Sequence, residues 1–300
     1  MLKHLAPRRL FETIRRRDCL RLIGSGMVGV AAPWVQRAQS SSGDLALGLT
    51  PVFLTNDLEL LSALKAYLET AVGRSIKLVL RRTYEDITTL LVSAQLDAAW
   101  ICGYPYVAFR DRLDLLAAPV WQRRPLYQSY IIAGSNNAAA SVDELRGSVH
   151  AFSDPNSNSG YLVTTALLAE RGLRPEHFFS RIFFTYGHRN VVRAVAAGLA
   201  DCGSVDGYVW EVMTETDPEL TRATRIVRKS EWLGFPPIAT PRGALTRLEV
   251  QALQQAFVNM AENREGQFVL RLLRLDGFER VEPALFGAIA AKSDFVRRFG

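Results

Sequence analysis

The chain has few of the residues that build disulfide scaffolds or metal centres. Its 300 residues include only three cysteines, at positions 19, 102 and 202, which is too few for a disulfide framework or a four-cysteine zinc or iron–sulfur site. Clusters of histidine and cysteine and paired carboxylates are also scarce, which argues against a metal enzyme or a glycosidase. No run of 18 apolar residues occurs, so the sequence predicts no membrane-spanning helix. We expect no metal and no cofactor.

The net charge of +6 is confined to one end of the chain. Residues 1–40 hold eight basic and two acidic side chains, whereas the other 260 residues carry 28 of each sign. The body therefore has no charge-driven affinity for polyanions, and nucleic acid is not an expected partner. A hydrophobic fraction of 48% with 22% charged residues is typical of a globular chain with a substantial core.

Residues 1–40 have the layout of a secretory signal. A basic stretch is followed by the apolar segment 22–32 and then by small polar residues. The stretch Arg16-Arg17-Asp18-Cys19-Leu20-Arg21 resembles a twin-arginine export motif. The alternative is an amphipathic N-terminal helix. We expect export, cleavage of the signal after about residue 38, and a periplasmic location.

Two stretches of the body each predict a strand, a helix and a parallel strand. The first runs over 76–80, 85–95 and 98–102, and the second over 182–184, 191–200 and 202–205. Aligning Asp97 with Asp201 sets Tyr84 against His188 without gaps. The pattern predicts two α/β lobes with comparable units, whether or not the chain arose by duplication. Cys102 ends one short strand and Cys202 begins another, in different halves of the chain, so we expect both to be buried and free.

The expected site residues follow strand ends, which is where open α/β sheets bind ligands. Tyr84 and His188 lie in strand-to-helix turns, Asp206 follows a strand, and a cleft between two lobes would bring them together. The strand 149–152 leads into Ser153-Asp154-Pro155-Asn156-Ser157-Asn158-Ser159-Gly160, followed by a predicted helix over 161–171. Small polar residues at a helix N-terminus form an anion site. Ordinary N-capping is the alternative explanation for Ser157 and its neighbours.

A hydrolase triad of Ser157, His188 and Asp206 is a further possibility that the residue types allow. The serine lacks the Gly-x-Ser-x-Gly setting of a nucleophile elbow, so we assign no catalytic residue. His150 lies inside an apolar strand and is expected to be a core histidine. Residues 234–239 are expected to form a strand that crosses back to the first lobe.

From about residue 44 to residue 240 the chain resembles the phosphate/phosphite/phosphonate-binding family of periplasmic substrate-binding proteins of ABC transporters. The segment 154–162 is similar to the family's Asp-Pro-x-Ser-Thr-Ser-Gly loop. Gly187-His188 with Ala194-Val195 and Asp201 resembles its Gly-His…Ala-Val…Asp segment. Tyr84, Asp97-Ala98-Ala99-Trp100 and Tyr127-Gln128-Ser129-Tyr130 resemble further parts of its pattern.

The resemblance implies an α/β fold of the two-lobed type II periplasmic-binding-protein class, with mixed sheets flanked by helices and a ligand cleft between the lobes. Lobe 1 would comprise 44–130 and 236–300, and lobe 2 would comprise 131–235. Ser157, Asn158, Ser159 and His188 would hold a phosphorus oxyanion, and Tyr84 and Tyr127 would cover it. Three departures stand out: Asn158 replaces a threonine, Cys102 replaces a common glycine, and Phe235 occupies a position where aminophosphonate binders place an acid.

The resemblance further implies a non-enzymatic, monomeric solute receptor for an ABC permease of the inner membrane. Its ligand would be phosphonate, phosphite, phosphate or another tetrahedral anion. A sensory receptor of the same fold and a Ser/His hydrolase acting on a small ester are the competing interpretations.

Overall fold

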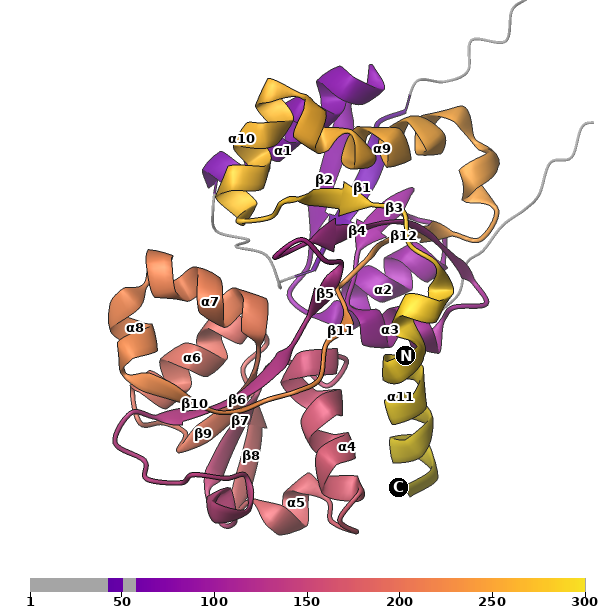
Figure 1. Ribbon diagram of the computed structural model, residues 1–300. Coiled ribbons are helices and arrows are strands. Elements are labelled where there is room, and N and C mark those ends of the chain that lie inside the picture. The colour runs from indigo at the N-terminus through magenta and orange to yellow at the C-terminus, as the bar shows by residue number, and fades with distance from the viewer. Residues whose placement is uncertain (1–42, 51–57, 300) are drawn as a thin grey trace, which may run out of the picture. The chain divides into compact units, whose positions relative to one another are not determined.

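The computed structural model describes residues 43–50 and 58–299, which form two β-sheets flanked by helices (Figure 1). The expected signal, residues 1–40, lies outside the described residues, so its twin-arginine-like character stays a prediction. In these two ranges no helix combines the length and the apolar character needed to cross a membrane.

The first sheet has six strands in the order β13-β4-β12-β3-β1-β2. Helices α1, α9 and α10 lie over one face of this sheet, and α2 and α3 lie on the other side (Figure 1). The bounds of these elements are β1 Leu45–Leu49, α1 Leu58–Val72, β2 Ile76–Leu80, α2 Tyr84–Val92, β3 Ala98–Trp100, α3 Gly103–Ala108, β4 Leu113–Val120, β12 Ile238–Pro241, α9 Leu248–Val258, α10 Arg264–Leu273 and β13 Gly277–Glu279.

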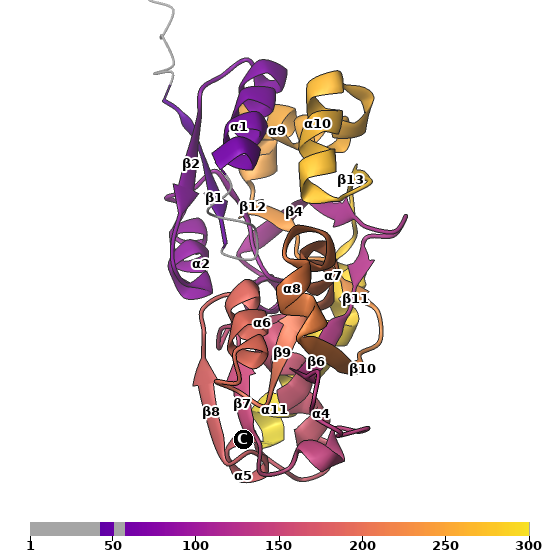
Figure 2. The same ribbon diagram turned by 90° about the vertical axis from the view of Figure 1, so that its left-hand side faces the viewer.

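The second sheet has five strands in the order β10-β6-β9-β7-β8. Helices α6, α7 and α8 cover one face, and α4 and α5 lie behind it (Figure 2). The C-terminal helix α11 packs against α4 and α3. The bounds are β6 Ser129–Gly134, β7 Val149–Phe152, the π-helical turn η2 Asn158–Leu162, α4 Val163–Ala169, α5 Pro175–Phe178, β8 Arg181–Phe184, α6 His188–Ala196, β9 Cys202–Asp206, α7 Gly207–Thr216, α8 Pro218–Arg222, β10 Thr224–Lys229 and α11 Gly287–Phe299.

A short antiparallel ribbon carries the chain between the sheets. It pairs β5 (Leu126–Tyr127) with β11 (Leu233–Gly234). The single strand expected over 234–239 is wrong: β11 ends at Gly234, and Pro236-Pro237 separates it from β12. Proline has no N–H to donate, so it interrupts a strand ladder. The lobe limits 44–130, 131–235 and 236–300 stay a proposal.

Both predicted strand–helix–strand units are present, each with one strand inserted. β2 and β3 both pair in parallel with β1, and β8 and β9 both pair in parallel with β7. The carboxyl ends of these strands lead into α2, α3, α6 and α7, and that edge of each sheet carries the expected site residues.

The expectations for three buried residues are confirmed. Cys102 and Cys202 are buried and free. His150 is fully buried, with Nδ1 3.1 Å from Cys202 Sγ, Nε2 2.9 Å from Ser204 Oγ, and its ring stacked on Phe179. It is a hydrogen-bonded core histidine, and burial lowers its pKa to about 3.

Candidate functional site

The turn between β7 and α4 is wound tightly around the N-terminus of the π-helical segment η2. Ser157 caps it, since its Oγ accepts the Gly160 N–H at 3.0 Å. The helix begins at Asn158, three residues earlier than expected, because Asn158, Ser159 and Gly160 belong to its first turn. The N-capping role expected as the alternative for Ser157 is therefore confirmed. Because Oγ acts as an acceptor in this bond, the Ser157 hydroxyl can still donate its own proton.

Unpartnered polar atoms gather in this turn. Four buried side-chain polar atoms of the described residues have no hydrogen-bond partner, and three of them belong to Ser153, Asn158 and Ser159. All three residues are buried. An unpartnered buried polar atom costs roughly 1–3 kcal/mol. Three of them beside one helix N-terminus therefore indicate a place built for a polar ligand.

Gly160 lets these groups approach one another. A Cβ at this position would overlap the Ser153 hydroxyl and would lie 3.0 Å from Cε1 of His188. The Ser153 hydroxyl and the His188 ring thus border the same small space above the turn. Any larger residue at 160 would push them apart.

His188 is a neutral hydrogen-bond donor. The backbone N–H of Asp206 donates to its Nδ1 at 3.0 Å, so the ring proton is assigned to Nε2. Burial lowers the His188 pKa to about 3, which keeps the ring neutral at physiological pH. Nε2 lies 3.2 Å from the Tyr84 hydroxyl, so the two residues that aligned in the sequence are in contact across the two sheets.

Four hydrogen bonds join α2, β5 and the residue before α3 to the second sheet, at His188 and at the turn between β7 and α4. Besides the contact between Tyr84 and His188, the Tyr84 N–H donates to Asp154 Oδ2 at 3.3 Å. Asn158 makes the other two: its Nδ2 donates to the Tyr127 hydroxyl at 2.8 Å, and its backbone N–H donates to Cys102 Sγ at 3.2 Å. Burial raises the pKa of both tyrosines well above the usual range, so each hydroxyl keeps its proton.

Asp206 is one of two buried acidic groups of this cluster, the other being Asp154. Asp206 Oδ1 accepts the Val209 N–H as the N-cap of α7. Burial raises its pKa to about 7, while the backbone N–H groups of Val209 and Tyr208 partly oppose that rise. At and below neutral pH the carboxyl therefore holds a proton that it can donate.

The structure thus brings all seven predicted site residues into one region: Tyr84, Tyr127, Ser157, Asn158, Ser159, His188 and Asp206. It does not form the hydrolase triad. Within the part of the chain that the structure describes, no hydrogen bond joins the side chains of Ser157, His188 and Asp206. His188 is held instead by the Asp206 backbone and contacts Tyr84.

Three residues of the region were not predicted. Asp154 links the turn to Tyr84, Ser153 carries an unpartnered hydroxyl, and Ser129 Oγ donates to the Ser159 carbonyl at 2.6 Å. Ser153 and Asp154 open the polar stretch itself, so their position was the available signal. Ser129 comes from a distant strand, and its signal was its place in the stretch Tyr127-Gln128-Ser129-Tyr130 that resembles the family pattern. No group of three or more His, Cys, Asp or Glu that could hold a metal occurs among residues 43–50 and 58–299.

Comparison with known proteins then identifies the family. Residues 47–286 match the family described as "ABC transporter, phosphonate, periplasmic substrate-binding protein". The chain belongs to this family. Its members are transport binding proteins, and the match spans both sheets and the whole site.

A relative and two solved structures agree with this assignment. The phosphate-import protein PhnD of Mycolicibacterium smegmatis is 25% identical over 210 residues, covering 66% of this chain and 64% of that protein, so the chain spans just under two thirds of its length. The binding protein component of a phosphonate ABC transporter from Pseudomonas aeruginosa superposes with a TM-score of 0.79 at 21% identity, covering 86% of this chain and 88% of that one.

PhnD1 of Prochlorococcus marinus, solved in complex with methylphosphonate, gives a TM-score of 0.76 at 17% identity over 85% of this chain and 98% of that one. At these identities the two structures support the fold alone. The predicted type II periplasmic-binding-protein fold is thereby confirmed.

Proposed function

We propose that this chain is an exported solute-binding protein that captures a phosphorus oxyanion for an ABC importer. The observation that carries the proposal is the concentration of unpartnered buried polar atoms in the turn of Ser153, Asn158 and Ser159. The Ser153 and Ser159 hydroxyls can donate to an anion at this helix N-terminus, whose dipole favours negative charge, and Asn158 Oδ1 can accept the proton of a protonated ligand oxygen. Family membership supplies the chemical class of the ligand, since phosphonate is the substrate that the family description names.

The charge state of the site fits a partly protonated oxyanion. His188, Tyr84 and Tyr127 are all neutral and carry protons, so they donate without adding net charge. Asp206, with its pKa raised to about 7, offers a further proton to a ligand oxygen. Phosphonates, phosphite and phosphate all present several oxygens to such donors, and we propose all three as candidate ligands.

The remaining parts of the proposal concern location and assembly. The basic and apolar segments of residues 1–40 support export by the twin-arginine route, cleavage of the signal and a periplasmic location. The partners are the small ligand and an inner-membrane permease, and the chain acts as a monomer without nucleic acid and without catalysis. A sensory receptor of the same fold would use the same site, and loss of ligand uptake on deleting the gene separates the two roles.

A thermal-shift screen of small anions tests the proposal. Methylphosphonate, phosphite and phosphate are compared with sulfate and acetate at matched ionic strength. A ligand at 100 times its dissociation constant stabilises the folded protein by about 2.7 kcal/mol. We expect at least one phosphorus oxyanion to raise the melting temperature and acetate to leave it unchanged. Equal responses to all five anions, or to none, would contradict the proposal.

A further inference from the structure

An open hollow of about 890 Å³ is lined by residues that lie next to Tyr84 and His188 in the chain. This outer hollow lies where β2 and β8 end and α2 and α6 begin, and its lining includes Arg81, Arg82, Thr83, Thr185, Tyr186 and Asn190. Thr83 precedes Tyr84 directly, and Tyr186 lies two residues before His188. The hollow is therefore lined by the chain neighbours of the two residues that contact each other across the sheets, Tyr84 and His188.

The outer hollow is electropositive. Arg81 and Arg82 are both exposed, and Asp86 is the acidic side chain of the lining. Arg81 donates to the carbonyl of its own neighbour Leu80 at 2.8 Å. Among the described residues none forms a hydrogen bond or an ion pair with the Arg82 guanidinium, so that group is available to a ligand. Two guanidinium groups against one carboxylate favour an anion.

The wall opposite the arginines is preformed. Tyr186 has a φ of 53°, in the left-handed region that residues other than glycine rarely adopt, and its side chain is 49% exposed. Thr185 holds this turn through Oγ1, which donates to the Gly187 carbonyl at 3.0 Å, and Asn190 Nδ2 donates to the Thr185 carbonyl at 3.1 Å. A strained backbone that presents an exposed aromatic ring beside a binding site is typical of a functional wall.

We propose that the outer hollow accepts the substituent of the bound phosphorus compound, and that Arg81 and Arg82 recognise an anionic group at its far end. The inference rests on the proposed function and names the ligand class more closely: organophosphorus compounds whose substituent carries a second acidic group. A cationic substituent is disfavoured here. Phe235, which packs 5.5 Å from the Tyr127 ring in the buried part of the site, likewise offers no acid to an amine.

Calorimetry with three ligands of equal chain length tests the inference. Propylphosphonate has a neutral tail, 3-phosphonopropionate an anionic tail, and 3-aminopropylphosphonate a cationic tail. A hydrogen bond to a charged group contributes about 1.5–3 kcal/mol. We therefore expect the anionic tail to bind on the order of tenfold more tightly than the neutral one, and the cationic tail to bind most weakly. Added salt should reduce the differences.

Substituting the two arginines tests whether the hollow causes the difference in affinity between the anionic and the neutral tail. Arg81→Gln with Arg82→Gln should remove the advantage of 3-phosphonopropionate and leave propylphosphonate affinity unchanged. Arg110→Gln, an exposed arginine outside the hollow, is the matched control and should change neither ligand.

The possible failures are distinguishable. If propylphosphonate binds and the anionic tail brings no gain, or if the double variant weakens both ligands equally, the inference about the hollow is wrong. If none of the three ligands nor methylphosphonate binds, the proposed function itself fails.

Discussion

Asn158 ties the turn between β7 and α4 to the first sheet through two of its polar groups. Its backbone N–H is engaged by Cys102 and its amide NH₂ by Tyr127, while its Oδ1 has no partner. Two departures from the family pattern, at positions 102 and 158, are therefore in direct contact. A threonine at 158 has no NH₂ group to donate to the Tyr127 hydroxyl. The sequence indicated both positions, but it could not show that they are in contact.

Asp206 makes ligand affinity depend on pH. Its raised pKa of about 7 means that it is neutral below that pH and becomes a carboxylate above it. A buried negative charge repels the bound oxyanion, so affinity should fall as pH rises through 7, by about tenfold per pH unit. Calorimetry between pH 6 and pH 9 measures this fall.

Asp206→Asn is the control for that pH series. Asparagine still accepts the Val209 N–H as an N-cap but does not titrate. The ligand's own ionisation affects both proteins equally, so the ratio of their affinities isolates Asp206. A ratio that stays constant from pH 6 to pH 9 would show that Asp206 does not sense the ligand.

At the scale of elements, the two strand–helix–strand units share one hydrogen-bonding pattern between an aspartate and a strand. Asp97 Oδ2 accepts the Ala46 N–H at 2.8 Å, and Asp201 Oδ2 accepts the Val149 N–H at 2.7 Å. Each acid's own N–H also returns to the same strand, to the Ala46 carbonyl at 3.0 Å and to the Val149 carbonyl at 2.9 Å. The alignment of Asp97 with Asp201 thus corresponds to a shared role, which is to anchor the start of the inserted strand.

Removing either anchor should cost similar stability. Asp97→Ala and Asp201→Ala each remove one hydrogen bond to a strand N–H that water can reach, at a net cost of about 0.5–1.5 kcal/mol. Asp97 also pairs with the exposed guanidinium of Arg247 at 2.7 Å, which adds at most about 1 kcal/mol. Urea titration measures the free energies of unfolding, with exposed Asp143→Ala as the control. If one variant lost stability and the other did not, the equivalence of the two units would be refuted.

The element boundaries show what sequence patterns could predict. Strand β2 has the expected bounds, 76–80, because its apolar run sets it apart from the flanking residues. The helix that follows β7 begins earlier than predicted because the Ser157 hydroxyl accepts the Gly160 N–H. Apolar periodicity does not encode this side-chain contact. The placement of β1 between β2 and β3, and of β7 between β8 and β9, escaped prediction, since the pairing of strands distant in sequence depends on tertiary contacts.

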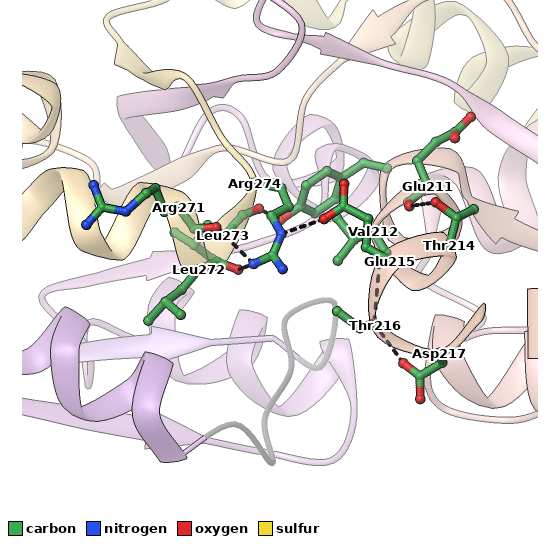
Figure 3. A network of polar contacts seen from close by, with 11 residues as sticks. Glu211, Val212, Thr214, Glu215, Thr216, Asp217, Arg271, Leu272, Leu273 and Arg274 are labelled. Carbon is green, nitrogen blue, oxygen red and sulfur yellow. Dashed lines mark hydrogen bonds and ion pairs between the residues drawn. The ribbon is translucent and has the colours of Figure 1, made fainter. Parts of the chain in front are cut away.

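At the scale of the whole described chain, a second set of contacts joins the two sheets, away from the turn between β7 and α4. Arg274, which follows α10, reaches Glu215 at the end of α7 at 2.9 Å (Figure 3). Its Nη1 also donates to the carbonyls of Arg271 and Leu272. The side chains of Arg274 and Glu215 are exposed, so this pair contributes at most about 1 kcal/mol. The stronger polar links between the sheets are the buried ones: the contacts among the proposed ligand-binding residues and the hydrogen bond from the Tyr208 hydroxyl to the Leu273 carbonyl.

This arrangement predicts that ligand binding draws on both sheets. Ser159 lies in the turn after β7 of the second sheet, and Tyr84 begins helix α2 of the first sheet. The Ser159 hydroxyl has no hydrogen-bond partner among the described residues. Removing that hydroxyl breaks no internal hydrogen bond, so it should cost affinity and not stability. Ser157→Ala differs, because loss of a cap costs about 1 kcal/mol of stability.

The most direct test is calorimetry of methylphosphonate binding to the unaltered protein, Ser159→Ala and Tyr84→Phe, with melting curves on the same samples. One hydrogen bond to a charged ligand is worth roughly 1.5–3 kcal/mol. Each variant should therefore bind about tenfold to a hundredfold more weakly, and Ser159→Ala should melt at the temperature of the unaltered protein. Variants that bind as tightly as the unaltered protein would contradict the account, because the turn of Ser159 and the hydroxyl of Tyr84 would then have no part in holding the oxyanion.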